Sequence, residues 1–525
     1  MYELITQRPE VMILGVPIDN VSLKSAIKRI LFFIKEYQQD KRPRQVATVN
    51  VDFLMNSLSW KISGPARHPE LLEILRKADM VTADGMPIVW LSQLLRTPLQ
   101  ERVTGADLIP ALAAAIAKTG HSIFFLGGKG DIAQQAANKL KKQHPSLNIA
   151  GIYSPFVYTE GEKMLSSEEQ DERILEQINQ ANPDILLVGF GNPKQELWFN
   201  RNRNKLKAAV TIGIGGTFEF IVGNVSRAPI WVQNIGMEWI YRIMQDPRRL
   251  WKRYAIGLTK LVVITIPLLW SNFLQRIKNR RLIKDHKPYP NDVKKGWNSY
   301  EMTIVLSKRL DAKSMNMFIK HWELCSADYK RLVFDFINVK FIDTNAIAML
   351  LRLYQRLQNK QINVSATGLV NEDVIKLLKV THAWDIVNGP EEENKMSLFL
   401  PGNDITADKH KLIVIRDQSK QLTVANLVGR LDANTVISMD FNQTIDLLGQ
   451  GDYILDLSSL SFLDSTGLRF FFSLQQDLKK RNKQIVLISP TATIKQLLEI
   501  TKLSDYFKVS NNEAQARLFL VKTDA

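Results

Sequence analysis

Polar side chains follow several apolar runs in the N-terminal half of the chain, where they could act on a substrate. Thr48 and Asn50 alternate along the run VATVNVDFL, and Asp84 precedes Gly85 at the end of the run DMVTAD. A carboxylate beside a glycine is open to a substrate hydroxyl and can take its proton. We therefore expect Asp84 to be a candidate base, with a turn or helix-cap carboxylate as the alternative interpretation.

Glycine-rich turns follow other apolar runs. FLGGKGD, over 125–131, lies between a strand pattern and a helix pattern, where free N–H groups can hold a phosphate. It has neither the spacing of a Walker loop nor that of GxGxxG, so a simple tight turn stays open as the alternative. GFGNPKQELW, over 189–198, also leads into a helix and carries Gln195, whose amide could contact a nucleotide. Several such turns at the ends of one sheet indicate a nucleotide-diphosphate site.

The elements that position these residues belong to an α/β fold. Residues 10 to 225 alternate short β-branched runs with amphipathic stretches such as Asp131 to His144 and Glu168 to Ala181. The runs cover 46–54, 79–84, 121–128, 184–191 and 208–216. This alternation predicts a mostly parallel sheet covered by helices. Ligands of such folds gather beyond the carboxyl ends of the strands, where the polar and glycine-rich residues lie.

Length and charge limit the class of protein and its partners. A chain of 525 residues with 45% apolar residues predicts about three or four folded domains and excludes a wholly disordered chain. The net charge of +16 favours nucleic acid, a membrane surface or a phosphorylated substrate. Residues 226 to 296 hold 15 Lys and Arg against 4 Asp and Glu, so most of the excess belongs to this segment. The single cysteine, Cys325, excludes an intrachain disulfide framework and fits a reducing compartment.

The basic segment interleaves tryptophans with arginines. WIYRIMQDPRRLWKRY, over 239–254, is typical of short amphipathic helices that seat aromatic rings and arginines in an anionic membrane surface. LVVITIPLLW, over 261–270, is interrupted by Pro267 and is shorter than the roughly 20 residues that cross a bilayer. A short membrane-embedded segment and a buried core helix are both open for this run. The N-terminus has no secretion-signal pattern, so we expect the catalytic part on the inner side of the membrane.

Seven stretches of the N-terminal half together resemble the WecG/TagA/CpsF family of bacterial glycosyltransferases. In chain order they are TVNVDF, VTADGMPIVW, ERVTGADL, FFLGGKGD, GFGNPKQELW, IGIGGTFEFIVGNVSRAP and MEWIYRIMQDPRRLWKRY. The resemblance covers about residues 12 to 256, and GNPKQE followed by GGTF and RAP is specific. It implies inverting transfer of an N-acetylmannosamine-type sugar from a UDP-sugar to an undecaprenyl-diphosphate-linked acceptor. It also implies no metal or other cofactor, no nucleic-acid partner and a peripheral place on the cytoplasmic face of the bacterial inner membrane.

The same resemblance assigns roles to individual residues. Asp84 would be the general base, with Thr48 and Asn50 positioning the substrate beside it. Arg102 and Gln195 would contact the diphosphate and nucleotide parts of the donor. Positive charge for the departing UDP would come from the arginines of the basic segment, namely Arg227, Arg242, Arg248, Arg249 and Arg253.

Beyond residue 300 the chain repeats itself. VLSKRLDAKSM at 305 is matched by NLVGRLDANTV at 426, and each copy predicts a small α/β unit. Each copy resembles a STAS domain, the fold of bacterial anti-sigma factor antagonists. In FLDSTGLRFF the resemblance makes Ser465 a candidate phosphorylation site for a partner kinase, whereas the first copy departs from the pattern at Thr344. The alternative is that both turns are capped helix starts in modules that bind protein partners without phosphorylation.

These patterns predict four segments. Residues 1–225 form the glycosyltransferase domain, 226–298 a basic membrane-associating appendage and linker, and 299–400 and 401–525 the two STAS-like domains. We expect an enzyme of cell-surface polysaccharide, teichoic acid or exopolysaccharide synthesis whose STAS domains regulate it or bind partners. The alternative is a catalytically inactive scaffold that acts through STAS partner switching, against which the intact candidate residues in the first domain argue.

Overall fold

The computed structural model describes most of the chain. The described residues are 10–60, 66–155, 157, 167–234, 236–284, 292–295, 301–324, 331–360, 362–384, 413–418, 422–433, 435, 451–504 and 506–521. Cys325 lies outside them.

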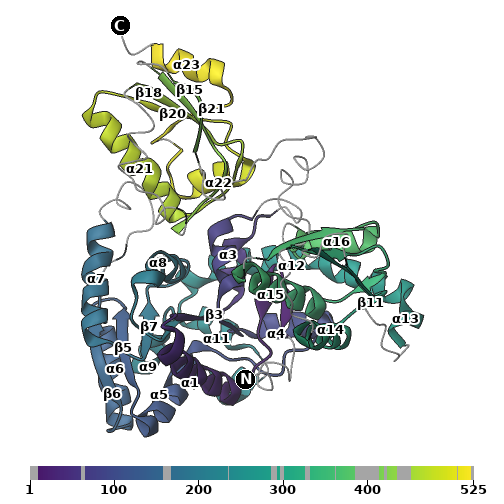
Figure 1. Cartoon of the computed structure of the whole chain (residues 1–525). Helices are drawn as coiled ribbons and strands as arrows, with labels where there is room; N and C mark the ends of the chain where they lie inside the picture. Colours follow the sequence, from purple (N-terminus) through teal and green to yellow (C-terminus); the bar gives the residue numbers. More distant parts are fainter. Residues whose placement is uncertain are drawn as a thin grey trace.

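A six-stranded sheet with every neighbouring pair parallel organises the N-terminal half of the chain (Figure 1). Its order is β4-β3-β8-β7-β5-β6. The strands are β3 (Arg44–Val49), β4 (Met80–Ala83), β5 (Ser122–Gly127), β6 (Asn148–Tyr153), β7 (Ile185–Gly189) and β8 (Val210–Gly213). Every residue of β3, β4 and β8 is buried, which explains why these runs are continuously apolar or β-branched rather than alternating. The predicted parallel α/β fold is confirmed.

Helices cover both faces of this sheet. The four on one face are α1 (Leu23–Asp40), α5 (Gly105–Thr119), α6 (Ile132–Gln143) and α9 (Thr217–Val222), whose apolar residues share a core with Val46, Phe125 and Ile212. The opposite face is covered by α2 (Val51–Ser57), α3 (Pro69–Lys77), α4 (Met86–Leu94), α7 (Ser167–Ala181) and α8 (Lys194–Asn202). A hairpin of β1 (Val11–Ile13) and β2 (Val16–Ile18), which the sequence did not predict, adds buried residues to this second face.

The expected strand at 46–54 is wrong beyond Val49. Asn50 adopts an extended conformation and its side chain accepts hydrogen bonds from the N–H groups of Asp52 and Phe53, so the chain turns into α2 at that point. An asparagine at this place is a strong helix start because it satisfies N–H groups that have no partner within the helix. The residue that looked like part of a strand is therefore a helix cap.

The expectation of only short helices in the basic segment is also wrong. After α10 (Ile230–Asn234) and α11 (Glu238–Gln245) comes α12 (Pro247–Lys278), which has 32 residues and runs through Pro267, and then α13 (Arg280–Lys284). Proline at this position removes the hydrogen bond to the carbonyl of Val263, a residue whose side chain is partly exposed.

The two repeats have matching topologies. The first has the sheet order β14-β12-β10-β9 with a separate β11-β13 pair, and the second has β15-β16-β18-β20-β21 with a β17-β19 pair. The first comprises β9 (Asp292–Lys295), β10 (Glu301–Val305), β11 (Arg309–Leu310), α14 (Ala312–Leu324), β12 (Arg331–Asp335), β13 (Phe341–Ile342), α15 (Thr344–Asn359), β14 (Asn363–Thr367) and α16 (Glu372–Val380). The second comprises β15 (Ile413–Gln418), β16 (Leu422–Leu427), β17 (Gly429–Leu431), β18 (Asp452–Asp456), β19 (Leu460–Leu463), α21 (Ser465–Lys480), β20 (Ile485–Ile488), α22 (Ala492–Ile500), β21 (Lys508–Ser510) and α23 (Glu513–Val521). In both, a parallel sheet follows one antiparallel edge strand, as expected of two copies of one unit.

Candidate functional site

Asp84 lies at the carboxyl end of the central sheet, directly after β4. Its N–H donates to the carbonyl of Val49 at 2.7 Å, which ties it to the end of β3. On β3, the hydroxyl of Thr48 donates to the carbonyl of Gly213 at 2.9 Å, and its side chain is almost fully buried. Thr48, Asn50 and Asp84 therefore gather at one edge of the sheet, but the oxygens of Thr48 and Asn50 already serve the fold.

Burial raises the pKa of Asp84 to about 6, while the nearby charges of Arg242 and Arg102 act in the opposite direction. The carboxylates of Glu238 and Asp107 raise the pKa a little further. At pH 7 a group with this pKa is ionised in about ten molecules for each one in which it is neutral. Asp84 is therefore a carboxylate that takes up a proton far more readily than an exposed aspartate does.

Arginines and carboxylates form a charge cluster around Asp84. Arg102 lies 2.8 Å from Glu238 and 3.7 Å from Asp107. Arg227 lies 3.0 Å from each of the same two carboxylates. Glu238 belongs to α11, so the segment after the sheet contributes directly to the site. We use the name charge cluster for Asp84, Arg102, Asp107, Arg227, Glu238 and Arg242.

The arginines predicted for this site differ in where they lie. The guanidinium of Arg242, on α11, stacks 4.3 Å above the ring of Phe220. Arg102, Arg227 and Arg242 are thus brought together, whereas Arg248 is exposed at the start of α12. The side chains of Arg249 and Arg253 lie outside the described residues.

Gln195 lies in a buried hydrogen-bond network at the start of α8. Its carbonyl oxygen accepts from the N–H of Gly215 at 3.0 Å, and its amide donates to Glu196 at 2.7 Å. Glu196 also accepts from Asn192 at 3.3 Å. Burial raises the pKa of Glu196 to about 8, so the carboxyl group is mostly neutral at pH 7. The network fixes Gln195 against β8, close to Gly213, where an added Cβ would come within 2.6 Å of its amide nitrogen.

The glycine turn at 127–130 lies apart from Asp84. Gly127, Gly128 and Gly130 have φ of +92°, +85° and +60°, which favours glycine, and α6 begins just after them. Four strand spacings separate β5 from β4 in the sheet, which is roughly 19 Å. Any part of a ligand bound at this turn is therefore distant from the part beside Asp84.

Sequence patterns missed Glu238 as part of the site. It is one of only 4 acidic residues in the basic segment, and this isolation among basic residues was the signal that could have identified it as an ion-pair partner. Asp107 and Arg102 lie on either side of Gly105 in ERVTGADL. The ion pair of Asp107 with Arg227 joins residues 120 positions apart, so no local sequence pattern indicates it. Among the described residues, no group of three or more His, Cys, Asp and Glu side chains is placed to hold a metal ion.

In the second repeat, Ser465 begins α21 directly after Asp464. The Asp464 side chain caps the helix by accepting from the N–H groups of Thr466 and Gly467 at 2.8 and 2.9 Å. Ser465 itself is only 5% exposed. In the first repeat, Asp343 similarly accepts from the N–H of Ala346 at 2.8 Å. Both turns have the geometry of capped helix starts.

Comparison with known proteins identifies relatives for both halves of the chain. The family model described as "Glycosyl transferase WecG/TagA/CpsF family" matches residues 11–277, and the STAS domain model matches 293–395 and 415–516. Two relatives are N-acetylglucosaminyldiphosphoundecaprenol N-acetyl-beta-D-mannosaminyltransferases. The protein from Bacillus subtilis (strain 168) is 29% identical over 52% of this chain and 96% of its own length. The protein from Staphylococcus aureus (strain MW2) is 30% identical over 53% of this chain and 96% of its own length.

Among solved structures, the anti-sigma factor antagonist SpoIIAA in its unphosphorylated form is similar to part of the chain. It is 18% identical, covers 20% of this chain and 91% of its own, and has a TM-score of 0.18. The STAS domain model and the strand order define the two repeats.

Proposed function

The chain belongs to the WecG/TagA/CpsF family of glycosyl transferases, and we propose that it transfers an N-acetylmannosamine-type sugar from a UDP-sugar to an undecaprenyl-diphosphate-linked acceptor. The relatives' names support this acceptor and this sugar. The product would enter the synthesis of a cell-surface polysaccharide or teichoic acid. The observation that carries the proposal is Asp84, a carboxylate with a raised pKa at the carboxyl end of the sheet, surrounded by arginines.

In the proposed reaction, Asp84 takes the proton from the acceptor hydroxyl as its oxygen attacks the anomeric carbon of the donor. The new C–O bond forms while the bond from that carbon to the diphosphate oxygen breaks, so UDP leaves with the bonding electrons. Attack from the face opposite the leaving group inverts the anomeric carbon. Asp84 carries the proton away, and the negative charge moves from Asp84 to the UDP.

The arginines of the charge cluster would stabilise the UDP as it leaves. Arg102 and Arg227 are held by Glu238 and Asp107, so the diphosphate would compete with these carboxylates for the guanidinium groups. We include Arg249 and Arg253 in the donor-binding set on the family resemblance alone. We propose that this charge replaces a metal ion, so that treatment with EDTA leaves the rate of transfer unchanged.

We propose that α12 holds the enzyme on the membrane surface. It is the one helix in the described part of the chain that is long and apolar enough to cross a membrane by length and composition. One side is packed on the protein, where Lys260 donates to the carbonyls of Met55 and Leu58 at 2.6 and 2.5 Å. The opposite side exposes a stripe at helical spacing, formed by Ile256, Val263, Ile266, Trp270, Phe273 and Ile277.

Helix α12 is apolar on two sides, unlike an ordinary surface helix, which is polar on the side that faces water. Leu261, Ile264 and Leu268 are buried against the protein together with Lys260, Asn272 and Gln275, while the apolar side chains of the stripe are exposed. This favours a helix that lies along the bilayer with its apolar stripe among the acyl chains and its other face on the catalytic domain. Exposed basic residues at both ends, such as Arg248 and Arg281, would contact anionic headgroups. The enzyme would thus be peripheral, on the cytoplasmic face of the inner membrane.

The test of the proposed reaction is UDP release in the presence of UDP-N-acetylmannosamine and a lipid-diphosphate-linked N-acetylglucosamine acceptor. We expect release by the full chain and a loss of at least a hundredfold in Asp84→Asn, because the amide cannot take the proton. Glu176→Gln, at an exposed carboxylate of α7, makes the same kind of change away from the candidate site and should keep the normal rate. Near-normal release by Asp84→Asn would refute the assignment of the base.

A catalytically inactive scaffold is the second candidate. The presence of two STAS domains favours a role in partner binding, which we propose in addition to transfer. No UDP release with any UDP-sugar, together with intact folding, would favour the scaffold over the enzyme.

A further inference from the structure

Both STAS repeats turn the same face toward the N-terminal half of the chain. In each, this face carries the start of the helix that follows a short strand pair, α15 in the first repeat and α21 in the second. The equivalent first residues are Thr344 and Ser465. Thr344 lies beside an apolar core that is shared with the catalytic domain, whereas Ser465 is surrounded by polar contacts. This difference indicates which repeat can separate from the catalytic domain.

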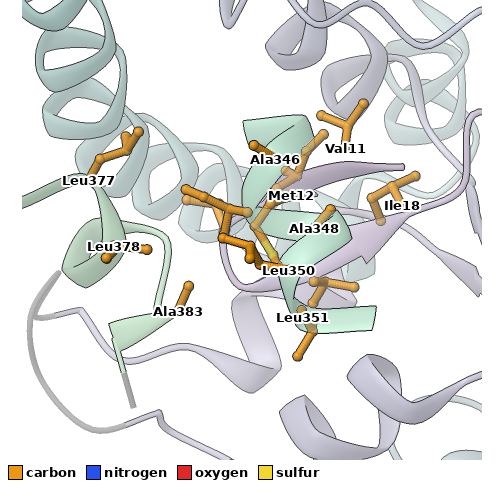
Figure 2. Close-up of a cluster of buried hydrophobic side chains, with 14 of the residues drawn as sticks. Val11, Met12, Ile18, Ala346, Ala348, Leu350, Leu351, Leu377, Leu378 and Ala383 are labelled. Atoms are coloured by element: carbon orange, nitrogen blue, oxygen red, sulfur yellow. The ribbon is translucent and has the colours of Figure 1, made fainter. Parts of the chain in front are cut away.

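The first repeat is joined to the catalytic domain through a shared apolar core. Figure 2 shows Val11, Met12 and Ile18 of the N-terminal hairpin beside Ala346 and Leu350 of α15, all within one buried cluster. Polar contacts at the rim add to this core. They join Thr344 to Thr97 at 2.9 Å, Asn345 to the carbonyl of Glu10 at 2.8 Å, and Arg352 to Glu10 at 2.8 Å. Separating this repeat would expose a large apolar surface to water.

The second repeat is joined to the catalytic domain through polar groups. The Ser465 hydroxyl donates to Glu70 at 2.8 Å, and the Ser465 N–H donates to the same carboxyl group at 3.0 Å. Two ion pairs flank this contact, from Arg430 to Glu73 at 2.6 Å and from Arg469 to Asp171 at 3.1 Å. The two apolar clusters of this repeat consist of its own residues only. Its separation would therefore expose little apolar surface.

We infer that the Ser465 face of the second STAS domain is a reversible docking surface for the chain's own catalytic domain, and that a negative charge at Ser465 releases it. The first repeat keeps the same contact permanently. The inference does not depend on the sugar or acceptor that the enzyme uses.

The surroundings of Ser465 are unfavourable to added negative charge. Burial raises the pKa of both Glu70 and Asp464. The carboxylate of Asp464 raises the pKa of Glu70 further, and that of Asp432 raises the pKa of Asp464 further. The nearest cation on α8, Arg201, is buried and is shared with Asp171, 3.5 Å away. A site that already resists ionisation of its own carboxyl groups would strongly resist a further charge. Because Ser465 is almost fully buried here, a kinase would reach it only after the domain has separated.

The docked surface also adjoins an element of the candidate active site. Arg201 lies near the end of α8, the helix whose first turn carries Gln195 and Glu196. Helix α3, which supplies Glu70 and Glu73, packs directly on α8. The second STAS domain therefore contacts the same helix that carries Gln195.

The test measures the separation of the domains in the full chain. Spin labels on cysteines placed at Lys142 of α6 and Lys495 of α22, both exposed, report the distance between them in a Cys325→Ser background. We expect one narrow distance distribution in the parent and in Asn482→Asp, which adds the same charge at the exposed far end of α21. Ser465→Asp should give a longer and broader distribution. A narrow, unchanged distribution for folded Ser465→Asp, or a broad one for the parent, would overturn the inference.

Two further variants separate release from misfolding. Glu70→Arg combined with Ser465→Asp should restore the narrow distribution, because the guanidinium can pair with the new carboxylate. Arg430→Glu should also release the domain, and Arg430→Glu with Glu73→Arg should dock it again by exchanging the two charges. Failure of both double variants to restore docking, with circular dichroism showing folded domains, would equally contradict the inference.

Discussion

At the scale of single residues, the role proposed for Asp84 follows from the cost of placing its charge at the site. Burial disfavours the carboxylate and raises its pKa to about 6, while Arg102 and Arg242 keep it from rising further. The result is a group that is ionised at neutral pH and is still basic enough to accept a proton. The sequence placed Asp84 after a strand and the family resemblance pointed to Arg242, but no pattern indicated Glu238, which comes from a helix more than 150 positions later.

The first prediction concerns the pH dependence of transfer. Because the base acts in its ionised form, we expect kcat/KM to rise about tenfold per pH unit below pH 6 and to level off above it. The measurement is the initial rate of UDP release between pH 4.5 and 8.5. A profile that is flat across pH 6 would remove Asp84 from the role of base.

The second prediction concerns stability. Folding raises the pKa of Asp84, so the ionised carboxylate is less favourable in the folded state than in the unfolded state. The resulting loss of stability begins above the ordinary pKa of an aspartate and reaches its full value above about pH 6. Asp84→Asn removes that charge, and we expect it to stabilise the catalytic domain by about 3 kcal/mol at pH 7 although it abolishes transfer. Thermal unfolding at pH 7 and pH 4 measures the gain, which should shrink at the lower pH. A variant that is less stable at pH 7 would show that the carboxylate is held favourably.

At the scale of elements, five of the six strands of the central sheet and most helices of the repeats were predictable from local patterns, whereas β6 is only partly buried and was not predicted. The predicted strands are mostly apolar or β-branched, and α15 and α21 have clear amphipathic spacing with an aspartate cap before each. The N-terminal hairpin and the full length of α12 were not predictable. The hairpin has only three residues in each strand and gains its burial from the first repeat, and α12 continues past a proline that ordinarily ends a helix.

The third prediction concerns the exposed stripe of α12. Replacing Ile266 and Phe273 by serine removes two apolar side chains that are exposed in the structure, so folding should be unchanged. We expect at least a tenfold loss of binding to vesicles that contain anionic lipid, measured by sedimentation. Replacing Lys142 and Lys495 by serine removes exposed charges away from the stripe and serves as the control. Unchanged sedimentation of the stripe variant would refute the proposed membrane face.

The fourth prediction concerns Glu196 as a positioning residue. Glu196→Gln keeps the size and the mostly neutral state of this side chain, whereas Glu196→Ala leaves the amide of Gln195 without its acceptor. We expect Glu196→Ala to raise KM for the UDP-sugar several-fold with a smaller change in kcat, and Glu196→Gln to stay near normal. Steady-state kinetics distinguish a selective rise in KM from a general loss of folding, which would lower kcat without a selective effect on KM. Equal kcat and KM for Glu196→Ala and the parent would contradict the role.

At the scale of the whole molecule, the chain combines one catalytic domain with two copies of a small domain that dock differently. The sequence showed the repeat, and it also showed that the first copy departs from the usual pattern at Thr344 and Asn345. It could not show that these residues face Thr97 and Glu10 or that Ser465 faces Glu70, because such contacts join residues hundreds of positions apart. The basic segment likewise contributes Glu238 and Arg242 of α11 to the charge cluster and an exposed apolar stripe on α12.

The fifth prediction concerns salt. Docking of the second repeat depends on two ion pairs, of which Arg430–Glu73 is partly exposed and Arg469–Asp171 is largely buried. Because salt screens the exposed pair, raising the salt concentration from 0.1 to 1 M should broaden the distribution of distances between the labelled domains. The first repeat, which is held by an apolar core, should stay docked under the same conditions. Labels on Lys142 and on the exposed Lys376 of α16 report its position. Equal responses of the two repeats to salt would argue against different modes of docking.

The most direct test of the account is mass spectrometry of the lipid product. The full chain is incubated with a panel of UDP-sugars and an undecaprenyl-diphosphate-linked N-acetylglucosamine acceptor, with Asp84→Asn in parallel. The account predicts that UDP-N-acetylmannosamine or a closely related sugar adds one N-acetylhexosamine to the acceptor, and that the variant adds none. An acceptor whose mass is unchanged with every donor, or a variant that forms product at the normal rate, would contradict it.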